Sequence, residues 1–190
     1  MAGKASSEID LGNRLDDLLV RRRSEILKRW VDLVFDSYPA ETSRFLRSKK
    51  NGIANPVGAS IRDGADKLYD WLVEGNVSDV ESIRVPLDNI VRIRAVQEFS
   101  AAHSMGFVFS LKTAVREILR EEIRRQQLFE ELLAFESKID ALSLLAFDNY
   151  SKCREQLHQI RAAEIRNRTS RILERVCQKY GMPSEWEDPE

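Results

Sequence analysis

The side chains best suited to bind a charged ligand or partner are Arg92, Arg94 and Gln97, at the end of one predicted helix. Arg94 and Gln97 are three residues apart and share a helix face, whereas Arg92 points in another direction. A guanidinium can bind a carboxylate through two parallel hydrogen bonds. The three residues are therefore candidate contacts for a protein partner or an acidic ligand. The alternative, which we favour, is that arginine here caps a helix C-terminus or pairs with an acidic residue inside the protein.

No pattern in the sequence predicts catalysis. It contains no glycine-rich phosphate loop, no HExxH zinc motif and no GxSxG nucleophile motif. Cys153 and His158 are five residues apart, on different faces of a helix, and no third metal ligand is near them. We therefore predict a protein that is not an enzyme and that has no metal and no cofactor.

The composition favours an all-α protein. Charged residues make up 32% and hydrophobic residues 43% of the 190 residues, with only eight Gly and five Pro. A net charge of −1 argues against general nucleic-acid binding. The first ten residues lack the apolar segment of a signal peptide, so we expect none, and no apolar run reaches the ~18–20 residues that span a bilayer. We expect a cytoplasmic protein in which Cys153 and Cys177 are free thiols.

Apolar residues recur at helical spacing through most of the chain. Asn55, which precedes a proline, and Ser100 are predicted N-caps. Gly58 and Gly64 inside a helix predict the close approach of a neighbouring helix or, alternatively, of a ligand. Pro86 is expected to restart a helix. The predicted helices span residues 8–21, 24–37, 41–47, 55–74, 86–97, 100–122 and 126–180.

The helix predicted from Ser100 to about Glu122 is apolar in nearly every direction, which is typical of a helix in the middle of a core. The other helices are expected to pack around it. This organisation predicts a disordered N-terminus at 1–7, a helical domain at 8–150, an extended helix at 151–182 and an acidic tail at 183–190.

The last predicted helix would be about 80 Å long if unbroken, which exceeds the size of a compact domain and favours a coiled-coil arm. Counting heptads from Leu132 places apolar residues on one seam, most densely in its first half. We predict that two chains form a homodimer by pairing these helices. The candidate dimer seam consists of Leu132, Phe135, Ile139, Leu142, Cys153 and Ile160.

Three stretches of the sequence resemble the RsbRD amino-terminal domain family, whose members are sensor modules related to the co-antagonists of the bacterial stressosome. They are Asn55-Pro56-Val57-Gly58, then RIRAVQEFS at residues 92–100, then GFVF at residues 106–109 with Leu111-Lys112. The resemblance implies a globin-like helical bundle without haem that is usually dimeric. In related proteins a long helix passes the signal to a phosphorylatable STAS domain, which we do not expect within these 190 residues.

A haem in a globin-like fold would need a proximal histidine on the helix before the central one. Residues 79–99 contain none, and the only histidines are His103 and His158. We therefore expect no haem.

Two functional hypotheses remain. The first is a stress-response regulatory module that signals by dimerisation and contact with an unidentified protein partner. That contact would involve the distal arm, residues 154–175, which has six Arg against three Glu. The second is a small-molecule binding protein that holds a fatty-acid-like ligand in an apolar cavity of the haem-less fold.

Overall fold

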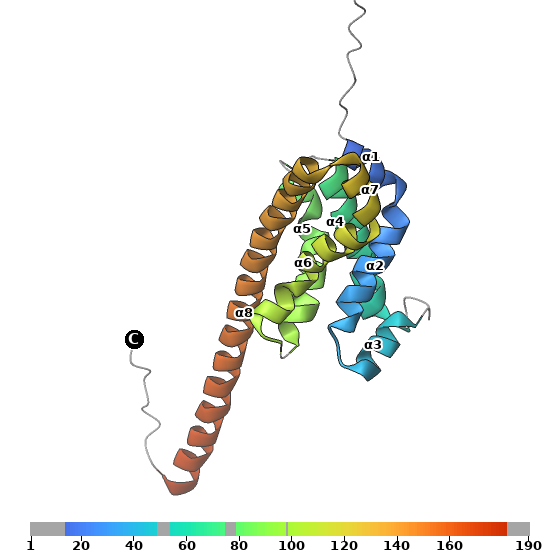
Figure 1. Cartoon of the computed structure of the whole chain (residues 1–190). Coiled ribbons are helices and arrows are strands. Elements are labelled where there is room, and N and C mark those ends of the chain that lie inside the picture. The colour runs from blue at the N-terminus through green and yellow to red at the C-terminus, as the bar shows by residue number, and fades with distance from the viewer. Residues whose placement is uncertain (1–13, 49–53, 75–78, 98, 182–190) are drawn as a thin grey trace, which may run out of the picture. The chain divides into compact units, whose positions relative to one another are not determined.

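The computed structural model describes residues 14–48, 54–74, 79–97 and 99–181, and every regular element in these ranges is an α-helix (Figure 1). The all-α prediction is therefore confirmed. The helices are α1 (Arg14–Arg21), α2 (Arg23–Asp36), α3 (Ala40–Arg47), α4 (Pro56–Glu74), α5 (Val80–Val96), α6 (Ala101–Ile118), α7 (Arg120–Gln126) and α8 (Phe129–Tyr180).

The chain divides into two compact units, Met1–Tyr150 and Ser151–Glu190. The first unit contains α1 to α7 and the beginning of α8. In the second unit, the described residues consist of the rest of α8 and Gly181. The long C-terminal helix expected from the sequence is present.

Side-chain caps determine where three of the helices begin. The Asn55 Oδ1 accepts a hydrogen bond from Gly58 N at 3.0 Å, and the Ser100 Oγ accepts one from His103 N at 3.2 Å, as the sequence predicts. Asp79 caps α5 through a bond from Ser82 N at 3.2 Å.

The prediction that a helix restarts at Pro86 is wrong, because Pro86 lies buried inside α5. An interior proline costs about 3 kcal/mol through the loss of one helical hydrogen bond and a steric clash. We attribute its tolerance to the cap at Asp79 and to the packing of α5 on α4, which offset that cost.

The predicted helix at 100–122 is divided into α6 and α7, and the last helix starts later than predicted. Leu119 separates α6 from α7 and is completely buried. Gln127 ends α7 in the left-handed conformation, with φ 57°, and α8 follows from Phe129. These breaks contain neither glycine nor proline, so the local composition does not predict them.

The core of the first unit is built on two helix pairs, α2 with α6 and α4 with α5. In the first pair the buried Trp30 donates its indole N–H to Phe107 O at 2.7 Å. In the second pair a Cβ added at Gly64 would lie 2.7 Å from the side chain of Ile90. An added Cβ at Gly58 would lie 2.8 Å from Leu46 O on α3. The close approach predicted at both glycines is therefore confirmed.

The expectation that the helix after Ser100 is buried all round holds for only part of its surface. Most of its apolar side chains are buried, including Val108 and Leu111, but Phe109 is 48% exposed. The side chain of Lys112 pairs with Asp140 of α8 at 2.7 Å, so polar contacts also reach this helix. None of the helices that the structure describes has the length and apolarity required to cross a membrane.

Candidate functional site

Arg94 lies near the end of α5 and has no exposed surface (0%). Its Nε donates a hydrogen bond to Ser104 O at 3.0 Å, and one Nη donates to His103 O at 2.8 Å and to the Ser37 hydroxyl at 3.2 Å. The acceptors belong to the first turn of α6 and to the residue that follows α2. One guanidinium therefore connects α5 to both α2 and α6.

Three aromatic rings surround the same guanidinium. The Arg94 Cζ lies 5.2 Å from the ring centre of Tyr38, 5.4 Å from that of Phe99 and 5.9 Å from that of Phe107. At these distances each ring can attract the cation by its quadrupole. The His103 ring stacks on Phe99, 4.2 Å between centroids, and its Nε2 is 2.8 Å from Ser37 O. We call this group (Ser37, Tyr38, Arg94, Gln97, Phe99, His103, Ser104 and Phe107) the arginine corner.

The arginine corner contains polar atoms without hydrogen bonds. Arg94 Nη1, Tyr38 Oη and Gln97 Oε1 are buried and find no partner of normal geometry among the described residues. No carboxylate in the described part of the chain pairs with Arg94. Burial lowers the pKa of Arg94 and raises the pKa of Tyr38, because each charged form loses hydration. An arginine nevertheless keeps its charge at neutral pH, so the corner holds a buried, uncompensated cation.

The structure separates the three residues that the sequence grouped. Arg94 and Gln97 belong to the arginine corner, where Gln97 ends α5. Arg92 is exposed and its Nε pairs with Asp88, one turn earlier on the same helix, at 2.5 Å. Arg94 binds backbone carbonyl oxygens and a hydroxyl instead of the expected carboxylate or helix C-terminus. The geometry therefore gives Arg94 a role in positioning helices, and leaves Arg92 as the member that a partner can reach.

Sequence reasoning missed most of the arginine corner. Ser37 and Tyr38 are more than fifty residues from Arg94, and nothing in their local pattern indicates a contact with it. The nearer members had a signal, because Phe99 directly precedes the Ser100 cap that turns the chain from α5 into α6, and Phe107 follows two turns into α6. Two aromatic residues so close to that turn could have been recognised as a site for the preceding arginine.

The predicted dimer seam falls on residues with different surroundings. Phe135, Ile139 and Leu142 are buried in the core of the first unit, at 2%, 0% and 0% exposure. In the same region Arg116 of α6 donates two hydrogen bonds to Glu136 of α8, at 2.6 and 2.5 Å. Leu132 is half-buried, Cys153 is buried and Ile160 is exposed. A second chain could reach Phe135, Ile139 and Leu142 only if α8 left the bundle.

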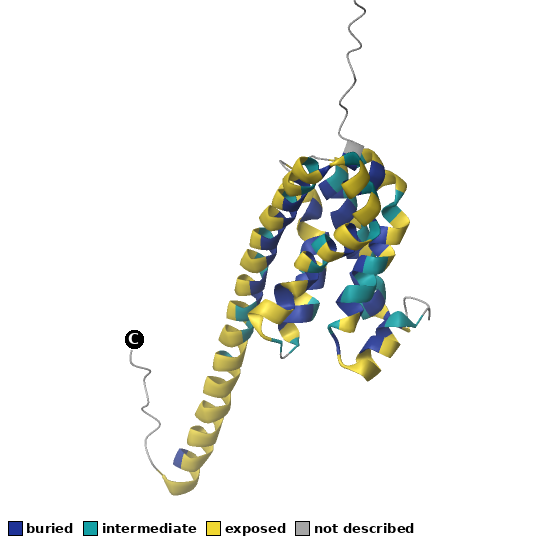
Figure 2. Ribbon diagram, in the orientation of Figure 1, coloured by how far each residue is buried: buried dark blue, intermediate teal, exposed yellow. Residues whose placement is uncertain are grey.

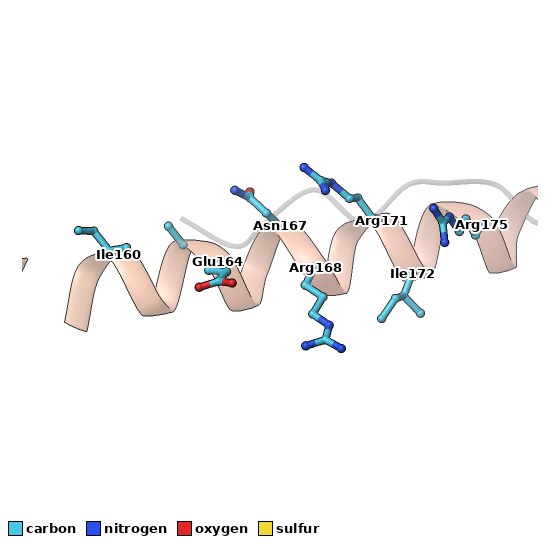
Figure 3. A pocket seen from close by; sticks show the side chains of 8 residues that line it. Ile160, Glu164, Asn167, Arg168, Arg171, Ile172 and Arg175 are labelled. Atoms are coloured by element: carbon cyan, nitrogen blue, oxygen red, sulfur yellow. The ribbon is translucent and has the colours of Figure 1, made fainter. Parts of the chain in front are cut away.

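The second unit differs in having almost all of its side chains exposed, as the yellow residues in Figure 2 show. Ile165, Ile172 and Val176 lie on one face of α8, and Ile165 is 66% exposed. Figure 3 shows that Arg168 and Ile172 extend from one side of the helix and Asn167 and Arg171 from another. The shallow hollow drawn there is lined by residues of α8 alone, so no second described element closes it.

The described residues contain no group of three His, Cys, Asp or Glu side chains that could hold a metal ion. Both cysteines are free thiols.

Comparisons with known proteins place most of the chain in one family. Residues 24–165 match the model of the family described as RsbT co-antagonist protein rsbRD N-terminal domain. No match was found among curated proteins or among solved structures. The match covers more than half of the chain, including the arginine corner, and extends into the second unit. The chain belongs to the RsbRD N-terminal domain family, whose members are regulatory sensor domains related to the stressosome.

Proposed function

We propose that this protein is a non-enzymatic regulatory module that acts by protein–protein contact, with residues 14–150 as the sensing unit and residues 151–181 as the output surface. The observation that carries the proposal is the exposed apolar stripe of the distal part of α8. An isolated helix in water is marginally stable, and most helices in proteins are stabilised by packing of an apolar face. A helix with exposed isoleucines is therefore suited to bind a partner.

The distal stripe can be defined by its heptad positions. Ala162, Ile165, Thr169, Ile172 and Val176 are spaced by three and four residues in alternation and therefore share one face. This stripe is displaced by two residues from the seam counted from Leu132, whose distal members include Asn167 and Ser170. The displaced stripe contains more apolar surface and is the better candidate for a contact.

The charges beside the distal stripe indicate the kind of partner. The flanking positions are Arg161, Arg166, Arg168, Leu173 and Arg175, with no acidic residue among them. A second copy docked on the same stripe would bring arginines together, and like charges across such a seam oppose pairing. An acidic amphipathic helix would match both the apolar stripe and its basic flanks.

We also propose that two copies pair, through a different face of α8. Leu133, Leu144 and Phe147 are exposed in the first unit and lie outside the buried face of α8 that contains Phe135, Ile139 and Leu142. Light scattering at micromolar concentration should give twice the monomer mass of 21.9 kDa, and Leu144→Glu should reduce it to that of one chain. If the wild type instead had the mass of one chain, 21.9 kDa, pairing would be contradicted, but the proposal of a distal contact would not be affected.

The distal contact is tested with the full chain carrying Ile165→Glu and Ile172→Glu. A pull-down from the native host should lose the partner that the wild type retains, because two charges would enter the apolar stripe. Ser170→Glu adds a charge to the same helix but outside the distal stripe, so this control variant should still retain the partner. Retention should weaken with added salt, since exposed charges are screened. Equal retention by all three proteins would locate the contact on the first unit instead.

A further inference from the structure

A groove on the first unit has the chemistry of a small-molecule site. It lies among α2, α3 and α4 and has a volume of about 450 Å³, within the ~300–1,000 Å³ of ordinary ligand pockets. Its apolar lining comes from Leu27, Val31 and Phe35 of α2. Its polar lining consists of Lys28, Asp32, Arg47, Arg62 and Asp66.

Both aspartates of this groove are paired with arginines, each of which also pairs with a second aspartate. Asp32 pairs with Arg47, which also binds Asp36 at 2.5 Å. Asp66 accepts a hydrogen bond from Arg23 at 2.8 Å. Neither carboxylate is therefore an unpaired anion that would repel an anionic ligand.

Arg47 is paired with carboxylates, but Lys28 and Arg62 have no carboxylate partner among the described residues. Lys28 is exposed and has no acidic partner among the described residues. Arg62 donates one hydrogen bond to Leu46 O at 2.7 Å, and its Cζ lies 5.0 Å from the ring centre of Phe35. The remaining guanidinium nitrogens of Arg62 make no hydrogen bond to a described residue. Two positive groups thus border an apolar lining without carboxylates of their own.

We propose that this groove binds a small amphipathic carboxylate. The carboxylate would accept charge-assisted hydrogen bonds from Arg62 and Lys28, while the apolar part of the ligand would lie on Val31 and the stems of the arginines. The site is on the surface, between helices that carry no buried uncompensated charge, and it is separate from the arginine corner. The inference does not rest on the proposed protein contacts.

The test uses decanoate as the probe and decanol as its uncharged counterpart, titrated into the isotope-labelled full-length protein and followed by NMR amide shifts. Decanoate should shift amides of α2, α3 and α4 and bind at least tenfold more tightly than decanol. Equal affinity for the two probes, or shifts confined to other helices, would overturn the proposal.

Variants assign the binding to the groove. Lys28→Gln and Arg62→Gln should each weaken decanoate binding several-fold, and Val31→Phe should block it by filling the groove. Arg84→Gln is the matched control, because Arg84 is exposed on α5 and pairs only with Glu81 on the same helix. Lys28 is a surface residue, so its variant should fold normally even if Arg62→Gln does not. Unchanged affinity in Lys28→Gln and Val31→Phe would show that decanoate binds elsewhere.

Discussion

The arginine corner and the distal stripe depart from the usual distribution of residues in opposite directions. In the first unit a guanidinium is completely buried, and in the second unit an isoleucine is 66% exposed. Lysine, glutamate, arginine and aspartate are almost never fully buried unless paired, whereas isoleucine is among the residues most often buried. Both features therefore need a physical explanation.

The difference lies in where the compensating contacts come from. Arg94 receives its hydrogen bonds and ring contacts from α6 and from the residues that follow α2, so much of the cost of its burial is offset within the first unit. Ile165 and Ile172 are exposed and have no such contacts within the described residues, which is why we propose that a partner covers them. The contacts within the first unit give Arg94 a structural role, whereas the exposed isoleucines of the second unit support the proposed interface.

The largest expected effect separates the two parts of α8. Leu142→Glu places a charge where the side chain has 0% exposure, and should destabilise the protein by at least about 4 kcal/mol. Ile165→Glu should leave the first unit as stable as in the wild type, because the introduced charge stays in water. Urea unfolding followed by circular dichroism measures both. If Leu142→Glu only changed the oligomeric mass, with stability intact, α8 would be packed on a second copy and not on α6.

The next prediction concerns the two arginines that the sequence grouped together. Arg94→Ala removes several hydrogen bonds and leaves a cavity among Tyr38, Phe99 and Phe107, so a loss of about 2–4 kcal/mol is expected. Arg92→Ala, the matched control, acts on an exposed side chain that pairs with Asp88 and should change stability by less than about 0.5 kcal/mol. Similar losses in both variants, measured by thermal or urea unfolding, would contradict the structural role of Arg94.

Helix content and several helix starts could be predicted because they depend on local sequence. The caps at Asn55 and Ser100 act on backbone groups within three residues, and the helical period is visible in any window of the chain. The break at Gln127 could not be predicted in the same way. A glutamine in the left-handed conformation has no composition signal, and tertiary packing has to hold it there.

The environment of each site residue was less predictable than the helices. The heptad count correctly placed Phe135, Ile139 and Leu142 on one apolar face, but periodicity cannot tell whether that face packs on the same chain or on another. Arg94 was named as a candidate contact, but its position beside Tyr38 depends on how α2 and α5 meet in space. Such contacts arise from long-range packing, which a single sequence does not contain.

A smaller effect tests how closely the helices of the first unit approach each other. Gly58→Ala would place a Cβ 2.8 Å from Leu46 O, a backbone atom that cannot move freely, and should cost about 1–3 kcal/mol. Gly106→Ala is the matched control, since its Cβ meets nothing within 4 Å and alanine favours a helix by roughly 0.5–1 kcal/mol. In urea unfolding, Gly58→Ala should therefore lower the free energy of unfolding and Gly106→Ala should raise it. A stabilising Gly58→Ala would mean that α3 and α4 are not in close contact.

The smallest effects distinguish two buried tyrosines of the first unit. The Tyr69 hydroxyl donates to Leu19 O at 3.0 Å, so Tyr69→Phe should cost about 1 kcal/mol at pH 7. The Tyr38 hydroxyl has no such partner among the described residues, so Tyr38→Phe should cost less than about 0.5 kcal/mol. Equal costs in urea unfolding would show that Tyr38 has a hydrogen bond, for instance to Gln97 Oε1.

The pH dependence of the same variants provides an independent check. Burial raises the pKa of both tyrosines above the ordinary value of 10.0. As the pH rises, the unfolded chain therefore loses these protons first, and the native protein binds more protons than the unfolded chain. The stability linked to each hydroxyl is complete below pH 10.0 and is lost as the pH rises through the folded pKa. Each Phe variant should accordingly lose less stability than the wild type between pH 9 and about 11, and parallel curves for all three proteins would mean that neither hydroxyl is shielded from water.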